Sequence, residues 1–241
     1  MNDHLTYHWD LIQGTDAWHE LRLGLLTASE LKNVITPTLK VADNKDTRSH
    51  LYKLVDERVS NYLEDHYESW DMARGKVEEI YAKDLYSKHV AQIKDCGFIT
   101  NNRWGFTLGF SPDGLVGDDG QVQVKSRNGK YQVQTIIDGV MPKDFVIQVQ
   151  SELLISERKW SEFISYSNGR PMFIHRIHPD EKIQGAIEEA CRAFEKRAKE
   201  LEEKYREKIE GMIQTERRDF ETGEEIKPSA PAQDANYLMA G

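Results

Sequence analysis

The sequence predicts an α/β domain in which a mixed central sheet is flanked by helices. Three observations predict this class: helical spacing of apolar residues in the first third of the chain, short apolar strands separated by turn residues in its middle, and a long amphipathic helix near its end. The 241 residues suffice for one large domain over residues 1–213, and residues 214–241 turn polar, which predicts a poorly ordered tail.

Composition excludes several classes of protein. Hydrophobic residues make up 39% of the chain and charged residues 30%, and no apolar run is long enough to cross a bilayer, which predicts a soluble protein without a membrane role. The N-terminus lacks a basic segment followed by an apolar stretch, so we expect a cytoplasmic protein. Cys96 and Cys191 stand far apart, without metal-ligand spacing around them, which predicts plain buried thiols. The net charge of -9 argues against a protein that coats nucleic acid.

Two helix signals come first along the chain. Residues 16–22 predict a short helix that ends near Gly24, and residues 27–30, Thr-Ala-Ser-Glu, have the pattern of a capping box at the start of a second helix. Backbone amides in the first turn of a helix are unpaired and attract anions, so Arg22, Ser29 and this helix start could hold a terminal phosphate. Ordinary capping alone is the simpler interpretation of the same residues.

Helical periodicity continues in three further segments. A polar loop is expected over residues 37–48, followed by helices at about 51–62 and 75–85. From residue 179 to Met212, apolar residues recur every three or four positions, which predicts one long amphipathic helix. Its apolar stripe packs on its own domain or, as the alternative, on another subunit.

Short apolar segments bounded by turn residues predict the strands. They lie at residues 97–100, 107–110, 121–125, 163–166 and 172–177. A helix is expected at 145–156, and Asn168-Gly169 suits a hairpin turn between the last two strands.

One predicted hairpin carries the most informative residues. Asp113 ends one strand within Ser-Pro-Asp-Gly, and the returning strand presents positions 123 and 125 on one face, because alternate strand residues share a face. Carboxylates and a lysine at this spacing suit a divalent cation held against a phosphate. Asp113 and the backbone carbonyl of Val124 would bind the metal, and Lys125 would orient the attacking water. Position 123 is Gln123, where a second carboxylate is expected.

Positive charge gathers next to this hairpin in spite of the acidic total. Residues 121–143 include one anionic residue, Asp138, and four cationic residues: Lys125, Arg127, Lys130 and Lys143. A DNA end would have to lie there, because phosphate affinity comes from clustered lysine and arginine.

Five motifs stand in a fixed order along the chain. They are residues 14–24 (GTDAWHELRLG), 26–30 (LTASE), 75–79 (GKVEE), 111–114 (SPDG) and 148–150 (QVQ). Together they strongly resemble the motifs of the phage lambda exonuclease family, the YqaJ-type viral recombinases, over roughly residues 13–178. The resemblance implies a restriction-endonuclease-like core of the PD-(D/E)xK type, with an exonuclease site at one end of a mixed sheet.

The resemblance also assigns roles to single residues. It implies that Arg22 and Ser29, with Ser111, contact a terminal 5′-phosphate, and that Glu79 and Gln150 line the active site. The hairpin with Asp113 and positions 123 to 125 would be the metal and catalytic centre, with Mg²⁺ as the cofactor and Mn²⁺ as an alternative.

Gln148 and Glu78, which lie close in sequence to expected site residues, are themselves expected to be structural. Gln148 and Gln150 cannot occupy the same helix face, so only one should reach the site, and the family pattern selects Gln150. Glu78 adjoins Glu79 but would point elsewhere on its helix, so we expect a solvated charge there.

The family's activity is implied by the resemblance alone. Its members are ATP-independent exonucleases, encoded by phages or prophages, that digest one strand of duplex DNA from the 5′ end. They form toroidal homotrimers that thread the DNA, and the 3′ single-stranded overhangs that they generate serve recombination with a single-strand annealing protein.

Gln123 departs from the family's carboxylate. A neutral amide keeps the shape of glutamate but gives up the charge that attracts Mg²⁺, so metal affinity and turnover should both fall. Either a glutamate was exchanged deliberately to trap substrate or metal, or Gln123 is natural and Glu79 compensates. An isosteric change that removes charge at the one position needing an anion favours the first interpretation. This chain is expected to bind DNA ends and to cleave them poorly.

Two other classes of function stay open. A DNA-end-binding recombination protein without native nuclease activity would explain Gln123 directly. A structural or regulatory partner of a recombination complex is disfavoured, because Arg22, Asp113 and Lys125 are all present.

Overall fold

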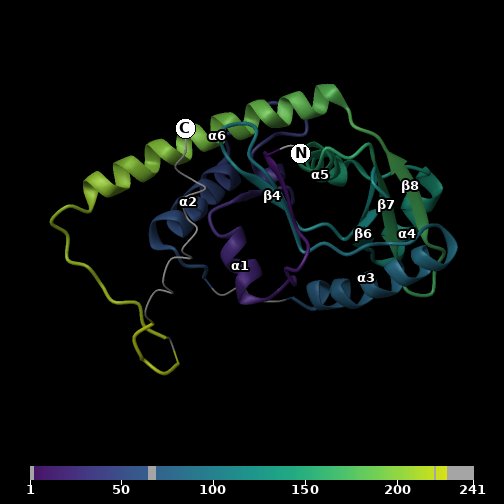
Figure 1. The fold of residues 1–241 in the computed structure, drawn as a ribbon, viewed down its shortest axis with the longest axis horizontal. Helices are drawn as coiled ribbons and strands as arrows, with labels where there is room; N and C mark the ends of the chain where they lie inside the picture. Colours follow the sequence, from purple (N-terminus) through teal and green to yellow (C-terminus); the bar gives the residue numbers. More distant parts are fainter. Residues whose placement is uncertain (1–2, 65–68, 220, 227–241) are drawn as a thin grey trace.

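The computed structural model describes residues 3–64, 69–219 and 221–226. It has the expected α/β class, with mixed sheets flanked by helices (Figure 1). The described strands form two four-stranded sheets instead of the single central sheet expected from the sequence. No helix in this part of the chain is long and apolar enough to span a membrane.

The first sheet joins strands from two distant parts of the sequence. Its order is β1-β3-β4-β2, with β1 (Leu5–His8), β2 (Leu26–Thr27), β3 (Phe98–Asn101) and β4 (Leu108–Phe110). Strands β1 and β4 lie on either side of β3, and both run antiparallel to it. Strand β2 runs parallel to β4, with Thr27 opposite Gly109. The ends of β2 and β4 therefore meet at the same edge of the sheet, just before residues 29 and 111.

The second sheet follows chain order. It contains β5 (Gly114–Val116), β6 (Gly120–Ser126), β7 (Trp160–Tyr166) and β8 (Phe173–Ile177). The antiparallel pair β5–β6 forms a hairpin, but Asp113 lies just before β5 rather than at the end of a strand, and the predicted strand at 107–110 is β4 of the first sheet. The sequence of β5 is too short to predict a strand. After the parallel pair β6–β7, the chain turns at Gly169, whose φ of +74° is the left-handed conformation that favours glycine.

Helix α5 (Val146–Ser156) lies between the two sheets (Figure 1). Ile147, Leu154 and Ile155 pack into the large core with the first sheet, whereas Val149 and Leu153 pack against β7. Because both sides of the helix are covered, a polar residue on it must find its partners inside the protein. The chain reaches α5 through α4 (Gly129–Asp138), which the sequence analysis did not predict, and a short 3-10 helix, η2 (Lys143–Phe145).

The N-terminal helices confirm one prediction and correct another. Helix α1 (Asp16–Arg22) ends before Gly24, which has a φ of +66°. The predicted capping box at residues 27–30 is wrong: Thr27 ends β2, and only a three-residue 3-10 helix, η1 (Leu31–Asn33), follows. The Thr27 hydroxyl donates to the Glu30 carboxylate at 2.8 Å and closes a turn, so no α-helix start is available there to bind an anion.

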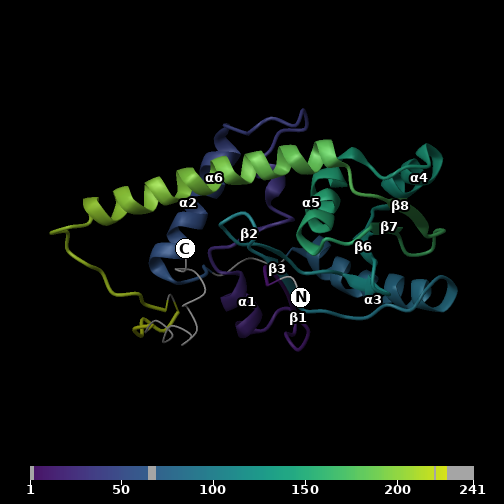
Figure 2. The same ribbon diagram turned by 45° about the horizontal axis from the view of Figure 1, so that its top comes forward.

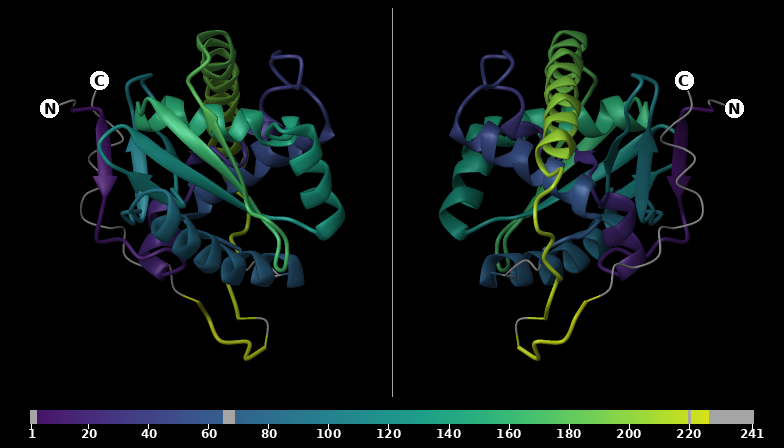
Figure 3. Two further views of the ribbon diagram at one scale, coloured as in Figure 1. Left: turned by 90° about the vertical axis from the view of Figure 1, so that its right-hand side faces the viewer. Right: turned by 90° about the vertical axis from the view of Figure 1, so that its left-hand side faces the viewer.

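A capping box does form further along the chain, at Asn44 and Thr47. The Asn44 side chain accepts from the Thr47 amide at 2.9 Å, and the Thr47 hydroxyl accepts from the Asn44 amide at 3.4 Å. It starts α2 (Lys45–Ser60) inside the stretch expected to be a polar loop. Helix α3 (Trp70–His89), longer than predicted, packs against β6 and β7. Figure 3 shows α3 below the sheets and α6 above them.

The long helix α6 (Glu181–Lys208) confirms the predicted amphipathic segment but ends before Met212. Its first half packs into the large core, whereas Tyr205 is 46% exposed where the helix projects past the body of the protein (Figure 2). Arg58 of α2 fixes the helix by donating to Glu195 at 2.9 Å and to Glu202 at 3.2 Å. Residues 227–241 of the predicted tail lie outside the described residues.

Candidate active site

The β5–β6 hairpin brings Asp113 and Gln123 into direct contact. Asp113 Oδ2 accepts hydrogen bonds from the Gln123 side-chain amide and, at 2.6 Å, from the backbone N–H of Val124. The same Gln123 nitrogen also lies 3.4 Å from the Val124 carbonyl oxygen. An amide NH₂ group therefore lies between the two oxygens that the sequence analysis assigned to a metal ion.

Helix α5 adds two residues that the sequence analysis did not identify as site residues. Gln148 Nε2 donates to Gln123 Oε1 at 3.2 Å and to Glu152 Oε1 at 2.8 Å. Gln148 and Glu152 share a helix face because they are four positions apart. The spacing of Gln148 and Glu152, four positions apart in the predicted helix, was the sequence signal that could have revealed this pair. Asp113, Gln123, Gln148 and Glu152 form one hydrogen-bonded line, called the carboxyl-amide line below.

Gln150 does not reach this line. Its side-chain oxygen accepts from the Asp180 amide at 2.9 Å, and its nitrogen donates to the His178 carbonyl at 2.8 Å. Gln150 therefore holds the chain that leads into α6. The prediction that Gln150 rather than Gln148 contacts the hairpin is wrong, because the two side chains leave the helix on different faces.

Asp113, Glu79 and Lys125 lie within electrostatic range of one another. Burial raises the pKa of Asp113, while the Lys125 ammonium and the Val124 N–H group oppose the rise. Burial and the Asp113 carboxylate raise the pKa of Glu79 to about 7, against the opposing effects of Lys83 and Lys125. Glu79 of α3 thus lies near the hairpin, as predicted, and pairs with Lys83 at 3.9 Å.

Glu152 of α5 also has a raised pKa, to which burial and the negative charge of Asp113 both contribute. Burial raises the pKa of Glu152 to about 8, and Asp113 adds to the rise, whereas Lys125 and the hydrogen bond from Gln148 oppose it. The Lys125 ammonium opposes the rise in pKa of all three carboxyl groups, Glu79, Asp113 and Glu152. A bound cation would relieve this excess of negative charge.

Arg22 lies beside the loop that carries Asp113. Its Nη1 donates to Ser111 Oγ at 3.4 Å, and Trp18 Nε1 donates to the same oxygen at 2.9 Å. The guanidinium lies over the Trp18 ring, 4.2 Å from the centroid, which fixes its direction. Burial lowers the pKa of the Arg22 guanidinium, but the group stays charged at neutral pH. Arg22 therefore contacts Ser111, two residues before Asp113.

Ser29 follows the end of β2, as Ser111 follows the end of β4. Because β2 and β4 are parallel and in register at Thr27 and Gly109, both serines lie at the same sheet edge. Ser29 is exposed, and its hydroxyl lies 3.4 Å from that of Thr27. Within the described residues, the structure brings Ser29 to this edge without joining it to Arg22.

Glu78 is buried, so the prediction of a solvated charge is wrong. It accepts from the Ser126 hydroxyl at 2.5 Å and from the Asn168 amide at 3.4 Å. These bonds tie α3 to the end of β6 and to the β7–β8 turn. Glu78 therefore holds the helix that carries Glu79 against the sheet.

Cations and aromatic rings alternate where the chain leaves β6. Lys125 Nζ lies 5.5 Å from the Phe145 ring centroid, and the Arg127 guanidinium lies 5.2 Å from the same ring. The Tyr131 ring receives Arg127 at 5.1 Å and Lys130 at 4.7 Å. Such contacts position the cations and leave their charges available to a phosphate backbone.

The donor atoms around Asp113 fit a hard divalent cation. The Asp113 carboxylate, the Val124 carbonyl and the nearby carboxyl groups of Glu79 and Glu152 are all oxygen ligands of the kind that Mg²⁺ and Mn²⁺ prefer. Among the residues that the structure describes, no three histidine, cysteine, aspartate or glutamate side chains are grouped so that they could hold a metal ion together. The Gln123 amide would have to leave Asp113 before an ion could bind.

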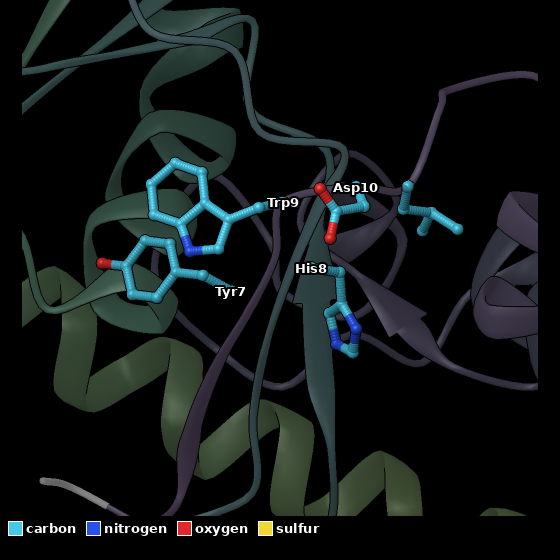
Figure 4. A pocket seen from close by; sticks show the side chains of 5 residues that line it. Tyr7, His8, Trp9 and Asp10 are labelled. Carbon is cyan, nitrogen blue, oxygen red and sulfur yellow. The ribbon is translucent and has the colours of Figure 1, made fainter.

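A separate hollow of about 430 Å³ is lined by residues 7–11 (Figure 4). The rings of Tyr7 and Trp9 stack with centroids 5.3 Å apart, and Lys94 Nζ lies 3.8 Å from the Trp9 centroid. Asp10 is the only carboxylate among the lining residues. The hollow contains no member of the carboxyl-amide line.

Comparison with known proteins agrees with this geometry. The family model of the YqaJ-like viral recombinase domain matches residues 17–159. An alkaline exonuclease from Laribacter hongkongensis matches with a TM-score of 0.73 and 25% identity, over 83% of this chain and 100% of that chain. The structure of that enzyme in complex with dAMP gives 0.69 and 26%, with the same coverage. A phage-related exonuclease from Haemophilus somnus, at 12% identity and a TM-score of 0.55, covers 75% of this chain and 96% of that chain and shares the fold.

Comparison with curated proteins gave no significant match. The family model covers more than half of the chain and includes Arg22, the β5–β6 hairpin and α5. The fold is that of the restriction-endonuclease-like alkaline exonucleases. The chain therefore belongs to the YqaJ-like viral recombinase domain family.

Proposed function

We propose that the protein is a metal-dependent deoxyribonuclease. It would act as an ATP-independent exonuclease that digests one strand of duplex DNA from the 5′ end and leaves 3′ overhangs for single-strand annealing. Family membership and likeness to the solved alkaline exonuclease support a recombination-related exonuclease. The observation that carries the proposal is the convergence of Arg22 with the loop of Asp113, beside the strand that bears Lys125.

One group of residues would bind the terminal 5′-phosphate of the DNA, and a second group would hold the metal ion and cleave the neighbouring phosphodiester. Arg22 and Ser111 would hold the terminal 5′-phosphate, with Ser29 at the same sheet edge. Asp113 and the Val124 carbonyl would hold Mg²⁺, or Mn²⁺ in its place. When bound, the ion supplies an activated water and neutralises charge on the phosphate. Lys125 would orient that water against the scissile phosphate.

Gln123 would make this chain a slow enzyme. Its amide nitrogen donates to the Asp113 oxygen that the metal ion needs, and its amide supplies no charge to replace that of a carboxylate. Metal binding must therefore break the Gln123–Asp113 hydrogen bond first. The expected result is retained binding of DNA ends and reduced turnover.

We also propose a homotrimeric ring around the duplex and cooperation with a single-strand annealing protein, both from the family resemblance. Exposed apolar side chains on α3 and α4 support association with further copies, among them Trp70, 88% exposed, and Ile137, 78% exposed. The cations at the end of β6 would face the phosphate backbone of the enclosed duplex.

A second candidate is a DNA-end-binding recombination protein without native nuclease activity. The hydrogen bond between Gln123 and Asp113 favours it, because the site is closed by its own side chains. Under this alternative, Arg22 would still bind 5′-phosphorylated ends, but no substitution at residue 123 would produce cleavage.

Digestion of a linear duplex tests the proposal. One end carries a 5′-phosphate and the other a 5′-hydroxyl, and a fluorophore at the 3′ end of each strand reports which strand is shortened. With Mg²⁺ and no ATP, we expect slow loss of the phosphorylated strand from its 5′ end, and no loss in Asp113→Asn. Digestion from 3′ ends, internal cuts, or the same rate in Asp113→Asn would contradict the proposal.

A further inference from the structure

Glu152 is a buried carboxylate without a direct cation partner among the described residues. It is 2% exposed and sits on the helix that lies between the two sheets. Its Oε1 accepts from Gln148 at 2.8 Å, and no other donor reaches the carboxylate in the described parts of the chain. Burying a carboxylate is costly unless a cation or several hydrogen bonds compensate it, so packing alone does not explain this residue.

The hydrogen bonds show where Glu152 is directed. Gln148 donates to Glu152 with the same nitrogen that contacts Gln123 at 3.2 Å, and Gln123 in turn donates to Asp113. The side chains of Gln123 and Gln148 therefore form the link between the carboxylates of Asp113 and Glu152. The charge of Asp113 also raises the pKa of Glu152, and Lys125 lowers the pKa of both groups.

The Gln123 amide marks a position suited to a cation. Its NH₂ group, which carries partial positive charge, donates to Asp113 Oδ2 and lies 3.4 Å from the Val124 carbonyl oxygen. Oxygen atoms gathered around a positive group are the surroundings that a hard divalent cation prefers. Withdrawal of Gln123 would free these oxygens and would also release Gln148 from Gln123, leaving Glu152 next to the vacated position.

We propose that Glu152 of α5 supplies the second carboxylate of the divalent-cation site, in place of the carboxylate that β6 lacks at position 123. This inference rests on the proposed function, because it concerns the same site. Glu79 is the competing carboxylate, but its side chain is 35% exposed and already pairs with Lys83 at 3.9 Å. Glu152 is buried and lacks such a pair within the described chain, so it gains more from a bound cation. Gln148 positions it.

A Mn²⁺-binding experiment tests whether Glu152 is a ligand of the cation. Mn²⁺ is added to the metal-free protein without DNA, and electron paramagnetic resonance measures the ion that stays free. We expect Glu152→Gln to weaken Mn²⁺ binding by about 10- to 100-fold or more. Loss of a residue that only hydrogen-bonds to a metal ligand already weakens metal binding by about 10- to 100-fold. Gln123→Glu/Glu152→Gln should recover the lost affinity, because the carboxylate then returns to β6. Glu162→Gln is the matched control: it removes a buried carboxylate that pairs with Arg176 at 2.8 Å on the second sheet, and binding should stay unchanged.

Two results would overturn the inference: equal Mn²⁺ affinity in the unmodified protein and in Glu152→Gln, or no Mn²⁺ binding by the unmodified protein. Thermal unfolding confirms that each variant is folded, and the double variant decides the question if Glu152→Gln alone is unstable. Failure of the proposed function is separable, because it would appear as absent DNA digestion by Gln123→Glu whatever the Mn²⁺ affinities are. An active Gln123→Glu, together with equal Mn²⁺ affinity in the unmodified protein and in Glu152→Gln, would refute the inference alone.

Discussion

Replacing Gln123 with glutamate is expected to raise Mg²⁺-dependent digestion of 5′-phosphorylated duplex DNA about 100-fold. The change replaces an amide that donates to Asp113 with a carboxylate that can share a cation with it. A 100-fold gain corresponds to about 2.7 kcal/mol of transition-state stabilisation, within the several kcal/mol that a bound metal ion supplies. Initial rates on end-labelled duplexes at saturating Mg²⁺ measure the effect.

The control for this prediction adds the same charge elsewhere. Gln214→Glu changes an exposed glutamine beyond the end of α6 and should leave the rate unchanged. If Gln123→Glu is folded, binds DNA ends and still digests no DNA, the second candidate function is correct and the nuclease proposal is wrong.

Arg22→Ala is expected to abolish the preference for 5′-phosphorylated ends. The Arg22 guanidinium, held by Trp18 and Ser111, is the fixed cation at this edge of the first sheet. Hydrogen bonds to a charged group contribute about 1.5–3 kcal/mol, so affinity for a phosphorylated end should fall roughly 10- to 100-fold, with little change for a hydroxyl end. Fluorescence anisotropy with a chelator present separates this binding from cleavage.

Arg48→Ala serves as the matched control, because Arg48 is an exposed arginine of α2 that pairs loosely with Asp43 at 3.7 Å. It removes the same charge and should preserve discrimination between the two kinds of end. Equal loss in both variants would show that Arg22 contributes only general positive charge, and the end-binding role would have to be abandoned.

The hairpin was predictable because its information is local. Asp113 immediately precedes β5, a tight turn joins β5 to β6, and the alternation of a strand puts positions 123 and 125 of β6 on one face. Glu152 was not predictable in the same way, because its proximity to Asp113 depends on how α5 packs between two sheets. A glutamate next to buried apolar residues of a helix indicates a polar partner inside the protein but does not say which one.

The region near Ser29 shows how tertiary pairing overrides a local pattern. Thr27 and Glu30 have the spacing of a capping box, but Thr27 pairs with Gly109 in the first sheet, and its hydroxyl closes a turn with Glu30. Ser29 and Ser111 nevertheless lie at the same sheet edge, because β2 and β4 are parallel and in register there, and Arg22 of α1 donates to Ser111. The sheet, rather than a helix start, positions the two serines.

The structure of the protein bound to a short 5′-phosphorylated duplex tests the central claim most directly. We expect the terminal phosphate within hydrogen-bonding distance of the Arg22 guanidinium and a neighbouring phosphodiester over Asp113 and Lys125. A DNA end seated on another surface, such as the hollow at residues 7–11, with Arg22 free of phosphate, would contradict the account.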